Sequence, residues 1–338
     1  MRRKVIIGIH GMGNKPPEKV LKNWWLASMY EGLRTHGYPK HSFRFELVYW
    51  AHHLHPLSYD PKLLDENDPL YVDEPYVPST GKVQPKPSSF RRRSLNFVEK
   101  ILDKLLLNED MTINYKSITD SIIRKHFKDL EIYYSSGCMG EKHKGKLARD
   151  VIRDDLREIL RKFRDFDILL VAHSMGTIIA YDVLNEEGKD RRVDTFVTMG
   201  SPLGLPVIIS RYAQQQRAFD QKIKPVTTPP NVLRRWYNLT DLEDRVAFNY
   251  DLQDDYAPNA LGVAAEDMIV HNDYEADGKA NHHKVYGYLR TRELAEIIDE
   301  FLTDDSSLAT PSIADRLRRF WVGLKTRLRG VGPVHDPA

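Results

Sequence analysis

The stretch DILLVAHSMGTIIAYDVL, residues 167–184, joins two apolar segments that have different spacings. Residues 168–172 are all apolar, as in a strand that is buried on both faces. Residues 176–186 have the apolar spacing of a helix. The letters HSMG lie between the two segments, so the sequence predicts a strand that turns into a helix at Ser174.

The residues around Ser174 fit a tight turn for a steric reason. A strand that becomes a helix within a few residues leaves this serine strained, and we expect it to be exposed. The residues two before and two after it have to be small because backbones cross there, and Ala172 and Gly176 meet this condition. The N-terminus of the helix favours negative charge that develops beside the serine.

Strands and helices alternate along most of the chain. Short apolar runs predict strands at 4–9, 42–50, 167–172, 193–200, 234–241 and 266–272. Amphipathic spacing predicts helices at 18–37, 146–163, 176–186 and 291–302. This alternation predicts an α/β fold with a doubly wound, mostly parallel sheet, in which functional groups collect at the carboxyl ends of the strands.

The alternation of strands and helices divides the chain into a core and an insertion. The core comprises residues 1–50 and 144–305, where the alternation is regular. Residues 51–143 interrupt it, and we expect them to form a largely helical cap with one helix in 94–107. That helix is either a lid with an apolar face or a helix packed permanently on the core.

The C-terminal segment, residues 306–338, is expected to form a basic amphipathic helix followed by a tail. Within residues 311–330 the apolar side chains fall on one helical face, and the arginines and lysines lie mainly elsewhere. Such a helix either lies on an anionic membrane surface or packs on its own domain or on a second subunit. The sequence leaves these alternatives open.

The composition limits the class of protein. Of the 338 residues, 41% are hydrophobic and 29% are charged, as in a soluble globular protein, and the net charge of +2 predicts no nucleic-acid binding. The single cysteine, Cys138, excludes an intramolecular disulfide. No apolar run reaches the roughly 18 residues of a membrane span. We therefore expect a cytoplasmic protein, with any contact to the inner membrane surface made peripherally by residues 311–330.

Three histidines, His52, His53 and His55, follow the predicted strand at 42–50. Alternate residues at the end of a strand face opposite ways, so we do not expect these three side chains to converge on a metal ion. The sequence predicts neither a metal site nor a cofactor.

The loop after the first strand is rich in glycine. The letters IIGIHGMGN, residues 6–14, allow the backbone to fold back at Gly11 and Gly13. A Walker phosphate loop is excluded because no Gly-Lys-Ser/Thr follows, and a dinucleotide fingerprint fails because Pro16 stands where its third glycine is due. A later strand ends in Gly-Ser-Pro within residues 197–206.

Taken in order, the letters HGMG, AHSMG, GSPLG, DRV and a late histidine resemble the serine esterase and lipase branch of the α/β-hydrolase fold. These motifs span nearly the whole chain except the insertion. The chain departs from the family in two respects. Alanine replaces the first glycine of Gly-x-Ser-x-Gly, and the usual antiparallel strands before the oxyanion strand are missing, since this strand starts at residue 4.

The resemblance implies a nucleophile and an oxyanion hole. Ser174 stands at the position of the family's nucleophile. The backbone N–H groups of Met175, directly after it, and of Met12, in the glycine loop, would bind the oxyanion.

The resemblance also implies the acid and the base, because the family's chain order is serine, acid, histidine. Among the acids after the predicted strand at 234–241, Asp244 fits best and Asp241 is the second choice. The base is expected just before the last helix, where His283 is preferred to His282.

These residues predict a serine hydrolase that cleaves a carboxylic ester, from a small molecule or a lipid, through a Ser-His-Asp triad and an acyl-enzyme. A thioesterase or an amidase would use the same triad. A non-catalytic binding module with a hydrolase-like fold is the alternative from another class. The sequence does not indicate the oligomeric state.

Overall fold

The computed structural model describes residues 2–81, 128–135, 145–219, 226–247 and 251–304. Its centre is a six-stranded sheet in the order β2-β1-β3-β4-β6-β8, with every neighbouring pair parallel. The strands are β1 (Lys4–Ile9), β2 (Arg44–Val48), β3 (Asp167–His173), β4 (Val193–Met199), β6 (Val232–Asp241) and β8 (Ala265–Val270). The predicted parallel sheet is confirmed for the described residues.

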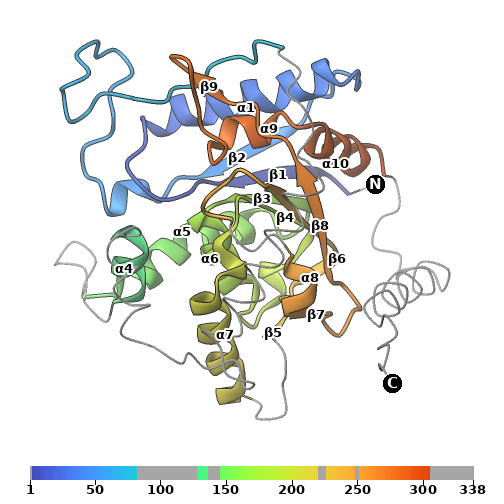
Figure 1. Cartoon of the computed structure of the whole chain (residues 1–338). Helices are drawn as coiled ribbons and strands as arrows, with labels where there is room; N and C mark the ends of the chain where they lie inside the picture. Colours follow the sequence, from blue (N-terminus) through green and yellow to red (C-terminus); the bar gives the residue numbers. More distant parts are fainter. Residues whose placement is uncertain (1, 82–127, 136–144, 220–225, 248–250, 305–338) are drawn as a thin grey trace, which may run out of the picture.

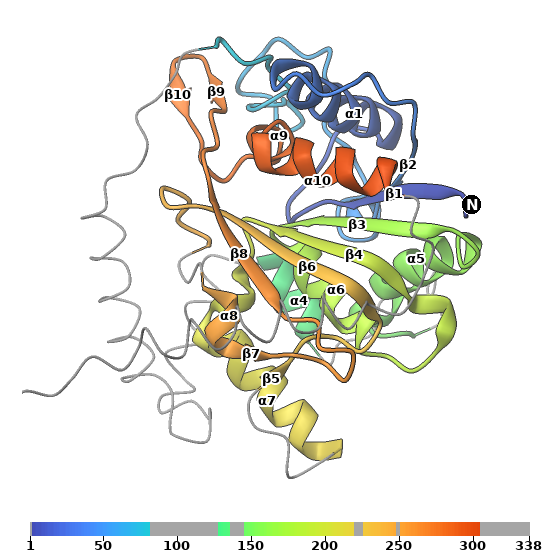
Figure 2. The ribbon, with the colours of Figure 1, turned by 90° about the vertical axis from the view of Figure 1, so that its right-hand side faces the viewer.

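Helices cover both faces of this sheet, as Figures 1 and 2 show. One face carries α1 (Glu18–Thr35), α9 (Val285–Leu289) and α10 (Arg292–Thr303). The other face carries α5 (Ala148–Lys162) and α6 (Met175–Leu184), with α4 (Lys128–Tyr134) against α5 and α7 (Pro206–Phe219) beyond α6. The sequence thus predicted the α/β class and its layers correctly.

The pleat of the strands explains why both faces are apolar. In β1, Val5, Ile7 and Ile9 pack into the core on the side of α5 and α6. Ile6 lies between them in sequence and packs into the core on the side of α1 and α10. All four side chains are fully buried. Burial of each contributes about 1.5–3 kcal/mol, so these continuous apolar runs require a helix layer on each face.

The order of the strands reverses between β1 and β3. The chain first places β2 beside β1, and then crosses to the other side of β1 to add β3. In the sheet, Ile9 pairs with Val48 on one side and with Ala172 on the other. The residues that follow β1 and β3 therefore emerge side by side at a topological switch point, where ligands bind in such sheets.

Short elements complete the described fold. Two small ladders pair β5 with β7 in parallel and β9 with β10 in antiparallel fashion. The short strands and helices are η1 (Ala51–His53), η3 (Lys189–Arg191), η4 (Pro202–Gly204), β5 (Val226–Thr227), α8 (Leu252–Asp255), β7 (Tyr256–Ala257), β9 (Glu275–Ala276) and β10 (Lys279–Ala280).

The described part of the expected insertion contacts the core closely. Tyr76 and Val77 pack against the apolar core under α1 and α9. Leu130 of α4 is buried in the core on the other face. The helix expected within 94–107 and the basic helix expected within 311–330 lie outside the described residues.

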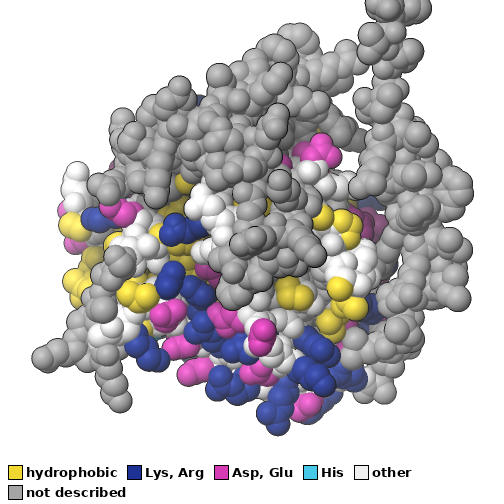
Figure 3. Space-filling view, turned by 90° about the horizontal axis from the view of Figure 1, so that it is seen from below, with side chains coloured by type: hydrophobic (Ala, Val, Ile, Leu, Met, Phe, Trp, Pro, Cys, Tyr) yellow, Lys and Arg dark blue, Asp and Glu magenta, His cyan; other side chains and the backbone are white. Residues whose placement is uncertain are grey.

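None of the described helices is both long enough and apolar enough to cross a membrane. Figure 3 shows the lower face of the molecule, on which lysine and arginine side chains alternate with aspartate and glutamate. Basic and acidic side chains also form ion pairs in the described structure, for example Lys146 with Asp154 and Arg157 with Glu186.

Candidate active site

Ser174 lies in a strained turn between β3 and α6. Its backbone has φ 51° and ψ −129°, a conformation that L-residues rarely adopt and that costs of order 1–3 kcal/mol. Gly176 explains why the turn is possible, because a Cβ there would lie 2.7 Å from the carbonyl oxygens of Ile9 and His10. The expected strain and the need for a small residue are therefore both observed.

The expectation that Ser174 is exposed was wrong. The residue is only 1% exposed, because the loop that follows β1 lies directly over it. Gly11 of that loop is so close that a Cβ on it would stand 2.7 Å from Ser174 Cβ. The serine therefore opens into a cavity rather than onto the outer surface.

Three side chains from separate parts of the chain form one hydrogen-bonded series. Ser174 Oγ lies 3.0 Å from His283 Nε2. On the other side of the imidazole, His283 Nδ1 donates to the carboxylate of Asp244, at 2.8 Å from Oδ2 and 3.0 Å from Oδ1. The acceptor at Nδ1 fixes the tautomer, so Nε2 carries the lone pair that faces the serine hydroxyl.

The loop before α9 holds His283 in place. Asn281 Oδ1 accepts the His283 backbone N–H at 3.0 Å, and Asn272 Nδ2 donates to the carbonyl groups on either side of His283, each at 2.8 Å. His173, next to the nucleophile, lies with its Nε2 2.8 Å from the His283 carbonyl oxygen. Burial holds the pKa of His173 well below its usual value, so the ring is neutral and donates through Nε2.

Asp244 is buried and has further donors. Val246 N–H donates to its Oδ1 at 2.8 Å, and the Tyr288 hydroxyl donates to its Oδ2 at 2.7 Å. Gly200 leaves the necessary space, because its φ is +52° and a Cβ there would stand 2.7 Å from Asp244 Oδ2. The carboxylate is thereby aimed at His283 by several hydrogen bonds.

The second choices, Asp241 and His282, lie outside this series. The Asp241 carboxylate accepts the backbone N–H groups of Glu243 at 2.7 Å and Asn272 at 2.6 Å. His282 pairs with Glu243 at 2.9 Å. Of the predicted residues, the structure brings together Ser174, Asp244 and His283.

Of the two residues expected to supply the oxyanion donors, Met175 directly follows Ser174 and Met12 lines the same cavity. Met175 is the first residue of α6, and the first N–H groups of a helix have no partner within it. Met12 belongs to the loop after β1, and both it and Ser174 line one cavity. Their roles as donors stay predictions.

The cavity has a volume of about 280 Å³. Aromatic and apolar side chains from α1 and α9 form part of its wall, and charged side chains form another part. The lining includes Leu21, Trp24, Trp25, Val285 and Tyr286 among the apolar group, and Lys15, Asp73, Glu74 and Lys284 among the charged group. The hydroxyl of Ser174 therefore meets a site suited to a small molecule of mixed polarity.

The histidines after β2 differ from expectation. His52 and His53 lie in a 3₁₀ turn, η1, rather than at the end of a strand, and their ring centroids are 3.9 Å apart. Both have nitrogen atoms within 4.8 Å of an Asp155 oxygen, whereas His55 pairs with Asp129. His53 and Asp155 already satisfy each other at 2.9 Å.

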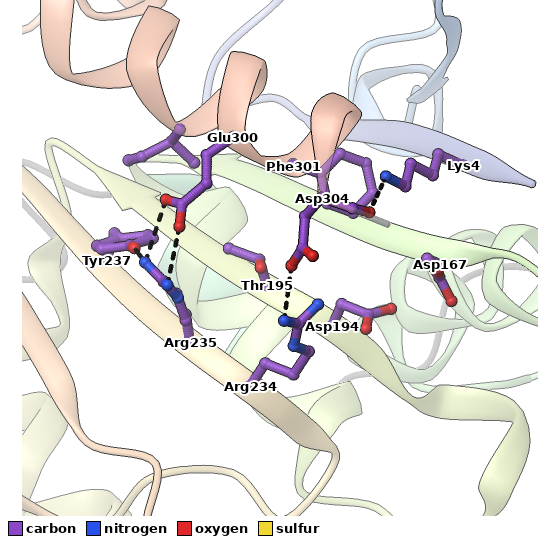
Figure 4. Close-up of a pocket in the computed structure, with 11 residues that line it drawn as sticks. Lys4, Asp167, Asp194, Thr195, Arg234, Arg235, Tyr237, Glu300, Phe301 and Asp304 are labelled. Carbon is purple, nitrogen blue, oxygen red and sulfur yellow. Dashed lines mark hydrogen bonds and ion pairs between the residues drawn. The ribbon is translucent and has the colours of Figure 1, made fainter. Parts of the chain in front are cut away.

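A second cavity, shown in Figure 4, lies at the amino ends of the strands and away from Ser174. Its volume is about 20 Å³, room for a single water molecule. Arg234 pairs with Asp304 at 2.7 Å and Arg235 pairs with Glu300 at 2.8 Å across it. This cavity is a gap closed by ion pairs between β6 and the end of α10.

Four residues that support the site were not assigned a role from the sequence. They are His173, Gly200, Asn272 and Tyr288. His173 and Gly200 act through contacts with distant segments, whereas the Asn272 side chain contacts carbonyl groups 10 and 12 residues later.

Neither a protein-family model nor a curated protein sequence matches this chain. The function is therefore argued from the geometry of the site.

Proposed function

We propose that this protein is a serine hydrolase of the α/β-hydrolase type that cleaves a carboxylic ester. The observation that carries the proposal is the series Ser174 Oγ–His283 Nε2 (3.0 Å) and His283 Nδ1–Asp244 Oδ2 (2.8 Å), which opens into a cavity. A nucleophile, a base and an orienting acid within hydrogen-bond distance are what acyl transfer requires.

In the first step His283 Nε2 takes the proton of the Ser174 hydroxyl while Oγ attacks the ester carbonyl carbon. The carbonyl oxygen becomes an oxyanion, for which the N–H groups of Met12 and Met175 are the proposed donors. Asp244 stabilises the imidazolium that forms and keeps its Nδ1 proton in place.

In the second step the imidazolium returns its proton to the alcohol oxygen as the carbon–oxygen bond breaks, which leaves an acyl group on Ser174. Water then attacks this acyl-enzyme while His283 accepts one of its protons. The free acid departs, and the proton on His283 returns to Ser174 Oγ.

The size of the cavity favours a small acyl group. About 280 Å³ lies just below the range for small-molecule pockets, which is about 300–1,000 Å³. Within the proposed class we therefore favour a small-molecule ester over a long-chain lipid ester. A thioester or amide would undergo the same steps with a different leaving group.

A fluorophosphonate probe tests the proposal, with the labelled residue mapped by mass spectrometry. We expect the wild type to be labelled at Ser174, Ser174→Ala not at all, and His283→Ala about 10²–10⁴-fold more slowly because its general base is gone. His282→Ala is the matched control, since this neighbouring imidazole faces Glu243, and it should keep the wild-type labelling rate.

Turnover of p-nitrophenyl esters then tests the substrate class. We expect kcat/KM to be highest for short acyl chains and to fall as the chain outgrows the cavity. A folded wild type that is not labelled would contradict the hydrolase proposal and favour the binding module instead.

A further inference from the structure

Lys15 is a cavity-lining cation to which the proposed mechanism gives no role. It is partly buried, and its ammonium donates to three consecutive carbonyl groups of the loop after β1. These belong to Met12, to Gly13 at 3.0 Å and to Asn14 at 3.2 Å. An ammonium group has three protons, so all of its donor capacity is spent on this loop.

The loop contacts fix the peptide group that follows Met12. In a planar trans peptide the C=O and the N–H point in opposite directions. The C=O of Met12 points to the Lys15 ammonium, and the N–H of Gly13 in the same peptide donates to Asp129 Oδ2 at 2.5 Å. A cation and an anion therefore hold this peptide group from its two ends.

The peptide group that precedes Met12 is also fixed. Its C=O belongs to Gly11 and lies 2.8 Å from His10 Nδ1. His10 Nε2 faces the backbone N–H groups of Trp50 and Ala51, at 3.2 and 3.3 Å, so the donor on this ring is Nδ1. Because the peptide groups on both sides of Met12 are held, the direction of its N–H is determined.

We infer that Lys15 is a positioning residue for the oxyanion hole, because its ammonium holds the peptide group after Met12 while His10 holds the one before it, and these two groups set the direction of the Met12 N–H. This inference rests on the proposed function. On this inference Lys15 supports stabilisation of the transition state and does not bind the substrate, because its three protons are already engaged within the loop.

The electrostatic surroundings of Lys15 disfavour its charged form. Burial and the nearby Lys284 ammonium lower the pKa of Lys15 to about 7, and Asp129 acts in the opposite direction. The Lys15 charge in turn contributes to the lowered pKa of both His10 and His173. The cation is therefore close enough to influence the groups on either side of Ser174.

Lys15→Met tests the inference, because methionine keeps much of the apolar stem and removes the ammonium. We expect kcat for a short p-nitrophenyl ester to fall about 10–100-fold, with KM within about threefold of wild type; losing a donor outright costs about 10²–10³. Affinity for a trifluoromethyl ketone, which adds Ser174 and mimics the tetrahedral state, should fall by the same factor as kcat/KM. Lys146→Met removes an exposed lysine and serves as the matched control.

A second variant keeps the test valid if methionine disturbs folding. Lys15→Cys can be alkylated with 2-bromoethylamine, whose bromide leaves as the thiolate forms a new S–C bond, and this restores an ammonium at nearly the original length. We expect alkylation to recover most of the lost kcat; wild type treated in parallel controls for reaction at Cys138.

Three outcomes would overturn the inference. The first is wild-type kcat and ketone affinity in Lys15→Met, the second is a loss confined to KM, and the third is a folded, alkylated Lys15→Cys enzyme that stays inactive. Failure of the proposed function is distinguishable from all three, because the wild type would then not be labelled at Ser174 by the fluorophosphonate.

Discussion

At the scale of the residue, Tyr288 shows how a single hydroxyl can support the site. It is fully buried, donates to Asp244 Oδ2 at 2.7 Å and accepts the Asp241 backbone N–H at 3.0 Å. Burial, and then the Asp244 charge, hold its pKa well above the usual value, so it stays a neutral donor. Tyr288 therefore holds the Asp244 carboxylate that faces His283. The same hydroxyl also contacts the backbone of Asp241, the second-choice acid.

Tyr288→Phe should lower both stability and activity. A hydrogen bond to a charged group contributes about 1.5–3 kcal/mol, and the change also leaves the Asp241 N–H without this acceptor. We expect the free energy of unfolding in urea to fall by about 1–3 kcal/mol and kcat/KM to fall about tenfold. Tyr237→Phe, whose hydroxyl contacts Arg235, is the control for loss of a tyrosine hydroxyl. An unchanged kcat/KM in Tyr288→Phe would show that Asp244 needs no support from this residue.

At the scale of the element, α6 can lie close to β1 only because residue 176 is glycine. Its missing side chain lets the first turn of the helix contact the carbonyl oxygens of Ile9 and His10. This contact brings the loop after β1 over Ser174. The element that presents the serine and the loop that covers it are thus held together by backbone contact.

Gly176→Ala should therefore push α6 away from β1. A Cβ at 2.7 Å from two backbone oxygens forces a shift, and overpacking of this kind costs about 1–3 kcal/mol. We expect a lower melting temperature and slower fluorophosphonate labelling of Ser174. Glu158→Ala, on the exposed side of α5, should leave both unchanged. Wild-type labelling in a folded Gly176→Ala protein would be evidence against this packing argument.

At the scale of the whole molecule, charged contacts join distant segments around the cavity. Arg290 is buried and donates to Glu31 of α1 at 3.3 Å, to Asp273 at 2.6 Å and to the Val77 carbonyl at 2.6 Å. Glu74, which lies close to Val77 in the sequence, pairs at 3.0 Å with Lys284, and Lys284 directly follows His283. These contacts hold residues 72–79 against the loop before α9, and so they close one wall of the cavity.

The stability of the molecule should depend on pH through Lys15. Its pKa is about 7 in the folded protein, whereas an unfolded lysine titrates near about 10.4. Between these values the unfolded chain binds more protons at this position, so its contribution to the free energy of unfolding rises with pH. The groups that face Lys15 here are Lys284, Asp129, His10 and His173.

The comparison of wild type with Lys15→Met isolates this titration. We expect the difference in free energy of unfolding, wild type minus variant, to rise from pH 7 to pH 10 and to be constant below pH 6, as measured by urea denaturation. A difference independent of pH would show that Lys15 titrates normally in the folded protein.

Prediction from the sequence succeeded where a local pattern carries the information. The sequence pattern identified each strand of the sheet with ends shifted by at most two residues, because strands buried on both faces, such as β1 and β3, form short apolar runs. The strained serine was predicted for a similar reason, since the strand, the turn and the small residues are all within ten positions. Its burial was not predicted, because the loop that covers it comes from residues more than 160 positions earlier.

By itself, the sequence determined the α/β class, the mostly parallel direction of its strands and the turn at Ser174, because these depend on periodicity and on sterics between near neighbours. Only the tertiary structure showed that Asp244 and His283, and not Asp241 and His282, form a hydrogen-bonded series with Ser174, and it alone showed the contacts of Gly200, Tyr288 and Lys15. Adjacent acids and adjacent histidines have the same local chemistry. What separates them is which one faces a partner from another strand end, and that is settled when the sheet brings those ends together.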